Sequence, residues 1–289
     1  MTRAEGRQAF KQGTANFVVR AKKSLGQNFL VDETVVARIV REFDPRADET
    51  VVEIGSGRGA LTARLVGAAG RLVAVEFDRE LIPFLRGRFG THEGFKLVGD
   101  DALGVDFCAE IAPASRARVV ANLPYNISTA ILQRLIAQRA CLTELVLMMQ
   151  REVVERVTAP PGSHERGYLS VLVEYYCESE KLFDVAPDAF RPVPKVWSTV
   201  VRLSLRGRPA AEVRDEALLW QLVSAGFAQR RKTILNNLRA APEQLRARAE
   251  TLGGAAPALE AAGVEPQRRA ETLTLAEWAR LSRTLEAAE

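Results

Sequence analysis

The chain has 289 residues, of which 47% are hydrophobic and 26% are charged, so a sizeable core is expected and wholesale disorder is not. The net charge of +4 permits an anionic partner but does not require one. No apolar run approaches the ~20 residues that a membrane-spanning helix needs, so a membrane protein is not expected.

The N-terminal segment, residues 1–21, is basic and lacks the apolar stretch that secretory signals carry. Its positive charges include Arg3, Arg7, Lys11 and Arg20. We predict a flexible basic arm, which either contacts an anionic partner or has no role.

From about residue 32 onward, apolar segments alternate with amphipathic ones. The first helix is expected to begin after Asp32, a good helix cap, because apolar residues follow it at helical spacing. Further helices are predicted at 60–66, 79–89, 129–138 (with Ser128 as its cap) and 169–176. Strands are predicted at 50–54, 72–76, 95–99, 119–122 and 145–149. Apolar strands separated by amphipathic helices indicate a parallel sheet covered on both faces.

Two later strands, at 180–185 and 199–205, follow a different pattern. Between them lies the segment 187–194, which contains three prolines and is too short for a crossover helix, so the two strands are expected to pair antiparallel. A Rossmann-like α/β sheet that is mostly parallel and ends in an antiparallel pair is the pattern of class I methyltransferases.

Beyond a linker at 206–209, the chain is rich in Ala, Leu and Arg and has helical periodicity without strand signals. Thr274 and Glu277 form a capping box before the last helix. The sequence thus predicts a basic arm (1–21), a catalytic α/β domain (22–207) and a small all-helical C-terminal domain (208–289).

The three cysteines, Cys108, Cys141 and Cys177, lack CxxC spacing, and the two histidines, His92 and His164, lie apart from them. The sequence therefore indicates neither a metal site nor a disulfide framework. A reducing cytoplasm fits this pattern.

A glycine-rich turn, Gly55-Ser56-Gly57-Arg58-Gly59, follows the strand at 50–54, and its glycines would let the backbone turn sharply and approach a ligand. Glu76 ends the next strand, where a carboxylate can accept hydrogen bonds from ribose hydroxyls. Asp101 follows the third strand, where it can accept the amino hydrogen of adenine. The GxGxG spacing, unlike the GxGxxG of dinucleotide folds, favours S-adenosylmethionine over a nicotinamide cofactor.

The fourth strand ends in Asn122-Leu123-Pro124-Tyr125, at the sheet edge where open α/β sheets bind ligands. An exocyclic amine is a weak nucleophile, because its lone pair is delocalised into the ring. The Asn122 oxygen and a carbonyl near Leu123 could accept its hydrogens, and Pro124 would hold that carbonyl in place. Tyr125 offers a ring on which an extruded base could stack.

Taken together, these motifs resemble those of the KsgA-type (RsmA, Dim1-like) ribosomal RNA adenine dimethyltransferases. The resemblance extends over nearly the whole chain from about Lys22. Besides the motifs above, it includes the segments 23–30, 126–129, 150–153, 167–170, 190–196, 227–237 and 268–274.

The resemblance implies S-adenosylmethionine as the cofactor, with Gln27, Asn28, Leu30, Gly55, Gly57, Glu76, Asp101 and Asn122 around it. It implies Asn122, Leu123, Pro124 and Tyr125 at the target amine, with Phe190 stacking on the other face of the base. The implied reaction dimethylates the N6 amino groups of two adjacent adenosines near the 3′ end of 16S ribosomal RNA, within the assembling small ribosomal subunit. A monomeric enzyme without a metal is expected.

Basic side chains are expected to bind RNA phosphates. Those near the expected rim of the site are Lys22, Lys23, Arg151 and Lys195, and a further cluster, Arg230, Arg231 and Lys232, lies at what reads as a helix start. Each could instead belong to an ordinary solvated face.

One residue departs from the family pattern. At Trp197 relatives more often have a polar residue, and an exposed tryptophan there could pack either on the helical domain or on RNA. Three other functions remain open from the residues alone: a large-subunit (23S) dimethylase of the macrolide-resistance type, a non-catalytic assembly or transcription factor on the same fold, and a nucleotide-linked dehydrogenase.

Overall fold

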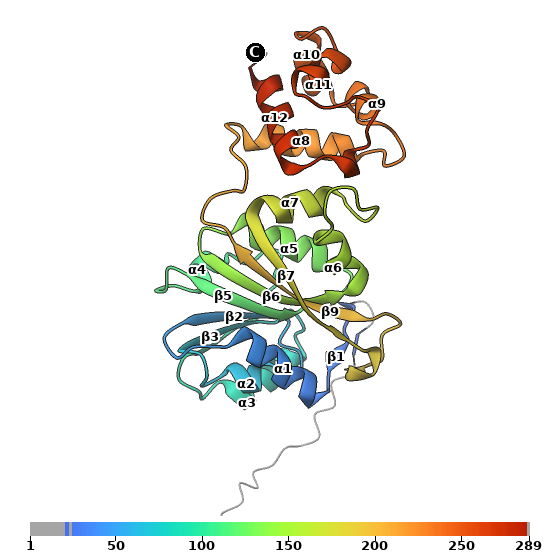
Figure 1. The fold of residues 1–289 in the computed structure, drawn as a ribbon. Helices are drawn as coiled ribbons and strands as arrows, with labels where there is room; N and C mark the ends of the chain where they lie inside the picture. Colours follow the sequence, from blue (N-terminus) through green and yellow to red (C-terminus); the bar gives the residue numbers. More distant parts are fainter. Residues whose placement is uncertain (1–20, 23–24, 288–289) are drawn as a thin grey trace, which may run out of the picture.

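The computed structural model describes residues 21–22 and 25–287, so Lys23 and all but the last residue of the predicted arm at 1–21 lie outside the described residues. Figure 1 shows an α/β part below and a group of helices above, which follows it in the chain. No helix in the described ranges is long and apolar enough to cross a membrane.

A seven-stranded sheet in the order β4-β3-β2-β5-β6-β9-β7 forms the centre of the α/β part. Its strands are β2 (Thr50–Ile54), β3 (Arg71–Val75), β4 (Phe95–Val98), β5 (Ala117–Asn122), β6 (Leu142–Gln150), β7 (Cys177–Val185) and β9 (Ser198–Leu205). The first five pair in parallel, and β9 pairs antiparallel with both β6 and β7. The predicted mostly parallel sheet with a terminal antiparallel pair is confirmed.

Successive strand residues face opposite layers of helices, which is why the strands are apolar throughout. Val51 packs with α1 (Glu33–Phe43) and α2 (Thr62–Leu65), whereas Val52 belongs to the core under the other layer. That layer contains α4 (Phe107–Glu110), α5 (Ser128–Ala137), α6 (Arg151–Val157) and α7 (Tyr168–Tyr176). The two layers lie on opposite sides of the sheet (Figure 1). The remaining helix of the α/β part, α3 (Leu81–Phe89), packs near the β4 edge of the sheet.

The strand order reverses at β2. From it the chain proceeds outward through β3 and β4, and it then returns to the other side of β2 as β5. Ligands in open α/β sheets bind at such a switch point, outside the carboxyl ends of the strands. The topology therefore predicts a ligand site at the loops after β2, β3 and β5.

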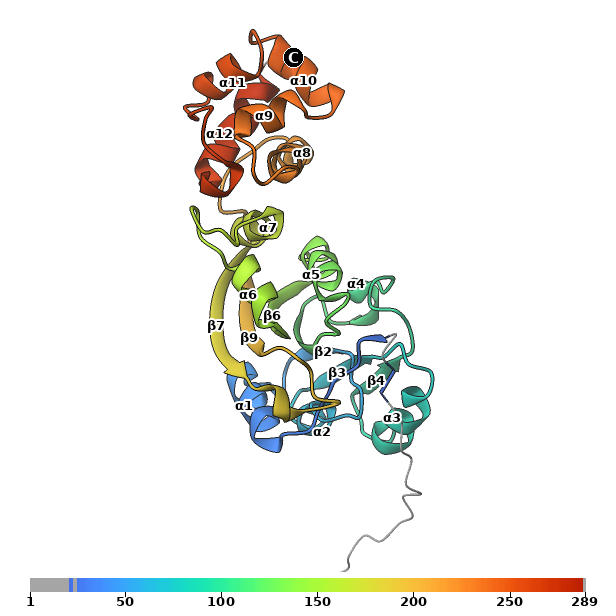
Figure 2. The same ribbon diagram turned by 90° about the vertical axis from the view of Figure 1, so that its right-hand side faces the viewer.

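The upper helices are α8 (Glu216–Phe227), α9 (Ile234–Arg239), α10 (Glu243–Glu250), α11 (Ala255–Ala261) and α12 (Leu275–Glu286). They surround Trp278, whose side chain is fully buried, and the predicted Thr274–Glu277 capping box is present at the start of α12. Trp220 of α8 contacts the rings of Tyr168, Tyr175 and Tyr176 on α7. The core is thus continuous from α7 into α8, at the junction seen in Figure 2.

Two glycines in helices make a matched test of this packing. A Cβ on Gly226 of α8 would overlap the Trp278 ring, whereas a Cβ on Gly87 of α3 would meet nothing within 4 Å. Gly226→Ala is expected to lower the free energy of unfolding by roughly 1–2 kcal/mol, because overpacking outweighs the gain in helix propensity. Gly87→Ala should raise it by roughly 0.5–1 kcal/mol. Denaturant unfolding measures both, and stabilisation by Gly226→Ala would show that the Trp278 core is loosely packed.

Two local predictions are wrong. Ser128 is the first residue of α5 and not its cap, because the N-cap position is Ile127, and the Ser128 hydroxyl donates instead to the Tyr125 carbonyl at 3.4 Å. Cys108 and Cys141 form a disulfide, with their Cα atoms 5.5 Å apart. They are 33 residues apart and meet only because α4 packs beside the turn that leads into β6, which residue spacing alone does not reveal. The described residues contain no cluster that could hold a metal ion.

Candidate active site

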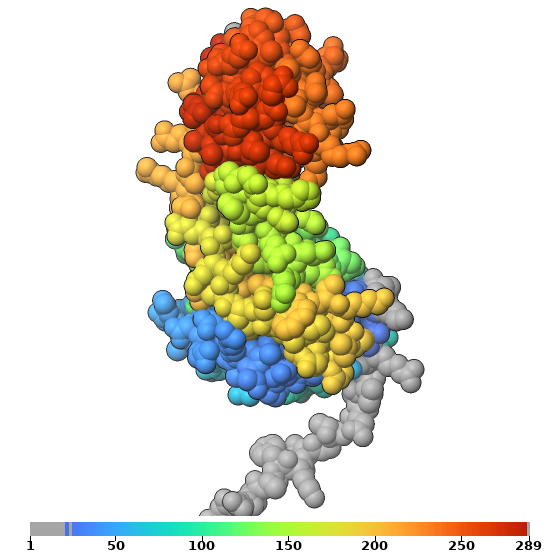
Figure 3. All heavy atoms as spheres, turned by 45° about the vertical axis from the view of Figure 1, so that its right-hand side comes forward, coloured from blue at the N-terminus to red at the C-terminus, as the bar shows by residue number. Residues whose placement is uncertain are grey.

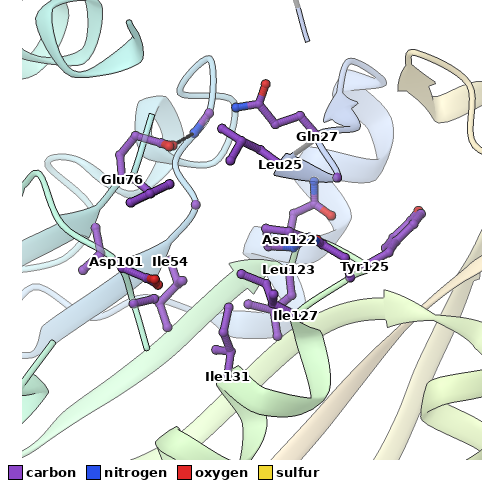
Figure 4. Close-up of a pocket in the computed structure, with 18 of the residues that line it drawn as sticks. Leu25, Gln27, Ile54, Glu76, Asp101, Asn122, Leu123, Tyr125, Ile127 and Ile131 are labelled. Carbon is purple, nitrogen blue, oxygen red and sulfur yellow. Dashed lines mark hydrogen bonds between the residues drawn. The ribbon is translucent and has the colours of Figure 1, made fainter. Parts of the chain in front are cut away.

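A cavity of about 240 Å³ opens at the switch point predicted by the topology. Its walls come from the segment before β1 (Phe29–Leu30) and from the loops that follow β2, β3, β4 and β5. Figure 4 shows Glu76 and Asp101 on one side of it, Tyr125 on the other, and Asn122 and Leu123 between them. Residues from five separate stretches of sequence therefore share one pocket.

The glycine-rich turn after β2 forms part of the wall. Gly57 has φ of +55°, which favours glycine, and its N–H donates to Glu76 Oε2 at 2.8 Å. A Cβ at Gly57 would lie 3.1 Å from the Phe29 ring. A larger residue here would therefore strain the backbone and press on β1.

Glu76 follows β3 and is held in a fixed orientation. Its Oε2 accepts from the Gly57 N–H, and its Oε1 accepts from the Asp78 N–H at 2.8 Å. Burial raises the pKa of this carboxyl group, and backbone hydrogen bonds, chiefly those from Asp78 and Gly57, oppose that rise. Each oxygen still has a free lone-pair direction, so the carboxylate can accept hydrogen bonds from the hydroxyls of a bound ribose.

Asp101 lies beside Glu76 in the cavity, and Oδ1 accepts from the Leu103 N–H at 2.9 Å. This bond fixes the side chain in the loop after β4. The remaining acceptor capacity is available to an amino group of a ligand.

Glu53 lies on β2 beneath the glycine turn and is 1% exposed. Its Oε2 accepts from the hydroxyls of Ser56 (3.1 Å) and Thr62 (2.6 Å), and burial raises its pKa to about 7 despite those bonds. Because both hydroxyls donate to Oε2, the proton of the neutral carboxyl group can be carried by Oε1. Glu53 thus anchors the turn and lies below the cavity wall, not in it.

The raised pKa of Glu53 predicts a pH dependence of stability. Between pH 4.5 and 7 the folded protein holds a proton that the unfolded chain has released, so the free energy of unfolding falls as pH rises through this window. Glu53→Gln mimics the protonated form and does not titrate. The free energy of unfolding of the variant minus that of wild type should therefore increase by roughly 2–3 kcal/mol from pH 5 to pH 8. Urea unfolding of both proteins at both pH values tests this. The same variant-minus-wild-type difference in the free energy of unfolding at pH 5 and pH 8 would contradict it.

Asn122 ends β5 and projects into the centre of the cavity (Figure 4). Its amide nitrogen donates to the backbone carbonyl of Asn28 at 3.1 Å. Because only the amide nitrogen can donate to a carbonyl, this bond fixes the orientation of the amide group and leaves Oδ1 as an acceptor for a ligand. Leu123 donates its N–H to the Met148 carbonyl at 3.1 Å, and no described residue donates to the Leu123 carbonyl. Two acceptor oxygens from neighbouring residues that line the cavity, Asn122 Oδ1 and the Leu123 carbonyl, are thus available.

Tyr125 lies at the opposite end of the cavity from Glu76. Its hydroxyl forms a 2.7 Å hydrogen bond with the Ser198 hydroxyl, which lies at the start of β9. Burial raises the pKa of Tyr125, so the phenol is neutral near pH 7. The ring is only partly buried and, together with Pro124, lines the cavity.

Residues 25–28 line the cavity on the side that is uppermost in Figure 4, and Lys22 secures them from outside it. Gln27 bridges this segment to the sheet, accepting from the Lys22 N–H at 2.8 Å and donating to Asp78 Oδ2 at 2.9 Å. Lys22 Nζ lies 2.6 Å from Asp78 Oδ1 and 3.0 Å from Glu80. Gln27 and Lys22 therefore secure the wall, and the Lys22 charge is paired within the protein, not free at the rim.

Two predicted site residues lie outside the cavity. The side chains of Leu30 and Phe190 are buried together in the core, because β1 pairs antiparallel with β8 (Phe190–Arg191) in the register Leu30↔Phe190. Phe190 is 0% exposed and does not line the pocket, so its predicted stacking on a base is not available in this structure. The sequence did not predict the short β1–β8 pairing that buries it.

The basic residues predicted to bind RNA lie in two separate regions of the described structure. Arg151 pairs with Asp184 at 3.0 Å, and Lys195 is exposed in the segment before β9. Arg230, Arg231 and Lys232 lie in the turn between α8 and α9, in the upper part of Figure 1, and are exposed. The Arg230 guanidinium donates to the His164 carbonyl, which ties this turn to the loop after α6.

Sequence reasoning missed several wall residues. Gly26 lines the cavity with φ of +63°, and only its being a glycine within the segment 23–30 could have indicated it. Asp78 does not line the cavity but secures its wall, and its place two residues after Glu76 could have indicated it. The apolar wall residues Leu25, Phe77, Leu103, Ile127 and Ile131 carry no local signal, because apolar residues at such positions usually belong to a core.

The sequence profile of a known family, described as ribosomal RNA adenine dimethylase, matches residues 18–282. The ribosomal RNA small subunit methyltransferase A of Hahella chejuensis is 42% identical over 263 residues, which are 91% of this chain and 92% of the relative. The protein of the same name from Moorella thermoacetica is 44% identical over 273 residues, with 92% of each chain covered.

Solved structures give a similar result. The 23S rRNA methyltransferase ErmE is 27% identical, with a TM-score of 0.66 over 90% of this chain and 100% of that one. A dimethyladenosine transferase from Plasmodium falciparum shares the fold at 23% identity, with a TM-score of 0.71 over 88% of this chain and 95% of that one.

Proposed function

Because the chain belongs to the ribosomal RNA adenine dimethylase family, we propose that it transfers methyl groups from S-adenosylmethionine to adenosine N6 atoms in 16S (small-subunit) ribosomal RNA. The proposed targets are two adjacent adenosines near the 3′ end, dimethylated during late assembly of the small subunit. The proposed enzyme acts as a monomer in the cytoplasm.

The orientation of Asn122 carries this proposal. Its amide nitrogen donates to the Asn28 carbonyl, which leaves its oxygen as an acceptor in a cavity that the next residue, Leu123, also lines. Two acceptors at this position match the two hydrogens of an exocyclic amine. They would pull the amine toward a pyramidal geometry and so release its lone pair for attack.

The residues around Glu76 fit the cofactor. The fixed carboxylate of Glu76 would bind the ribose hydroxyls, Asp101 would bind the adenine amino group, and the turn at Gly55 and Gly57 leaves room for close approach. When bound, S-adenosylmethionine supplies an electrophilic methyl on its sulfonium. The protein then needs to bind, orient and exclude water, and positioning of this kind accounts for a large share of rate.

The target base is proposed to enter from the Tyr125 side. The partly buried Tyr125 ring, held by Ser198, can stack on a base, and Pro124 fixes the backbone at the Leu123 carbonyl. For a base on this side, Asn122 lies between it and the residues proposed for the cofactor (Figure 4).

RNA would be held by exposed cations in both parts of the chain. We assign catalysis to residues 22–207 and RNA contact to the helical residues 208–289, with Arg230, Arg231 and Lys232 on phosphates. Lys195 and Arg151 would add contacts near the cavity. Lys23 and the arm at 1–21 stay candidates, of which only residue 21 belongs to the described part of this end of the chain.

A small-subunit substrate is preferred over a large-subunit one. The small-subunit enzymes of Hahella chejuensis and Moorella thermoacetica are 42% and 44% identical to this chain, against 27% for the large-subunit enzyme ErmE. A non-catalytic role is less compatible with the preserved Asn122 and Glu76 geometry.

Incubation with labelled S-adenosylmethionine and unmethylated small or large subunits tests the assignment. Dimethyladenosine is expected only in the small-subunit RNA. Label in the large subunit alone would support the alternative substrate, and no label in either would reject catalysis.

A further inference from the structure

Trp197 and Arg151 form a stacked pair on the surface. The Arg151 guanidinium carbon lies 4.7 Å from the centroid of the Trp197 ring, and the Arg151 N–H donates to the Trp197 carbonyl at 2.9 Å. These residues directly follow β6 and directly precede β9, which pair antiparallel in the register Gln150↔Ser198. The sheet itself therefore fixes the pair in place.

The surface around the pair is apolar and cationic. Val193, Val196 and Trp197 are 55%, 39% and 46% exposed, and Lys195 is exposed between them. We call these four residues together with Arg151 the Trp197 platform. In Figure 3 the gold segment that connects β7 to β9 lies at the molecular surface.

The platform adjoins the target end of the cavity. Ser198, the residue after Trp197, is fully buried, and its hydroxyl forms the hydrogen bond to the Tyr125 hydroxyl. Trp197 is thus one residue away from the group that holds the Tyr125 ring. An RNA strand that places one base on Tyr125 therefore enters beside the start of β9, the same point of the sheet at which the platform is anchored.

We propose that the Trp197 platform stacks an unpaired base that adjoins the target adenosine in the RNA substrate. This rests on the proposed function. An exposed indole backed by a guanidinium is a surface on which any base can stack, and Lys195 adds positive charge next to the RNA backbone. Asp184 neutralises only one of the two cations, so the platform keeps a net positive charge.

Intrinsic fluorescence provides a direct test. The chain has three tryptophans, of which Trp278 is fully buried, Trp220 is partly buried against three tyrosines and Trp197 is exposed. Quenching that occurs in wild type and is lost in Trp197→Tyr therefore arises from Trp197. A short unstructured adenine-rich oligoribonucleotide should quench the emission of wild-type protein, and unchanged emission at saturating RNA would overturn the proposal.

Variants give the second arm of the test. Trp197→Ala should raise the Kd for the labelled oligoribonucleotide roughly tenfold or more, whereas Trp197→Tyr, which keeps a stacking ring, should stay near wild type. Arg151→Ala should also weaken binding. Arg64→Ala is its matched control, because Arg64 is an exposed arginine paired with one carboxylate, Glu33, at the same 3.0 Å. Circular dichroism confirms that each variant is folded.

The outcomes separate this proposal from the proposed function. Quenching by RNA without any methyl transfer would reject the function and keep the platform. Methyl transfer by wild type with unchanged RNA binding in Trp197→Ala would keep the function and reject the platform. If Trp197→Ala loses activity on assembled subunits but binds the oligoribonucleotide normally, a ribosomal protein occupies the platform and the proposal is wrong.

Discussion

Replacing Asn122 with alanine is expected to lower the rate constant for methyl transfer by roughly 10²–10³-fold, the usual loss when one preorganised hydrogen-bonding group is removed from an active site. The substitution removes the Oδ1 acceptor that the Asn28 carbonyl orients by accepting from the amide. Asn122→Asp should also be slow, because a carboxylate cannot donate to the Asn28 carbonyl and would be repelled from it. Single-turnover assays on small subunits with saturating cofactor isolate this step.

The control for Asn122→Ala is Asn236→Ala, which removes an exposed asparagine of α9 far along the chain from the cavity. It should leave the rate unchanged. A rate within threefold of wild type for Asn122→Ala would mean that the Leu123 carbonyl alone activates the amine, and the assignment of Asn122 would be abandoned.

The sheet could be predicted from the sequence because its signals are local. The strand at β2 coincides with the predicted segment 50–54, since an apolar run bounded by polar residues and glycines has few alternatives. The antiparallel pairing of β7 with β9 followed from a connection too short for a helix. Glu76, Asp101 and Asn122 were found for the same reason, because each follows or ends such a strand.

What the sequence did not reveal depends on contacts between distant segments. Nothing near Phe190 indicates that it pairs with Leu30 and is buried, because two-residue strands have no periodicity. The charge of Lys22 predicted a free cation, but Asp78, which is 56 residues away, pairs with it. The Cys108–Cys141 disulfide was missed in the same way. Charge and residue type are local properties, whereas pairing is decided by the fold.

Glu76 is the subject of the second large prediction. Glu76→Ala removes the carboxylate proposed to bind both ribose hydroxyls, and hydrogen bonds to a charged group contribute about 1.5–3 kcal/mol each. The Kd for S-adenosylmethionine should therefore rise roughly 10²-fold or more. S-adenosylhomocysteine carries the same ribose and should lose affinity by a similar factor, which calorimetry can measure without turnover.

Glu76→Gln removes the charge of the side chain but keeps its size, so it complements Glu76→Ala. In wild type both carboxylate oxygens accept from backbone N–H groups, those of Gly57 and Asp78. A glutamine must turn its NH₂ toward one of these donors, so two donors would face each other and the side chain would lose its fixed orientation. Glu76→Gln should therefore bind the cofactor nearly as weakly as Glu76→Ala, whereas Glu93→Gln, at an exposed site after α3, should bind as wild type does. Wild-type affinity in Glu76→Gln would show that the ribose is held elsewhere, because a glutamine without a fixed orientation cannot replace the carboxylate.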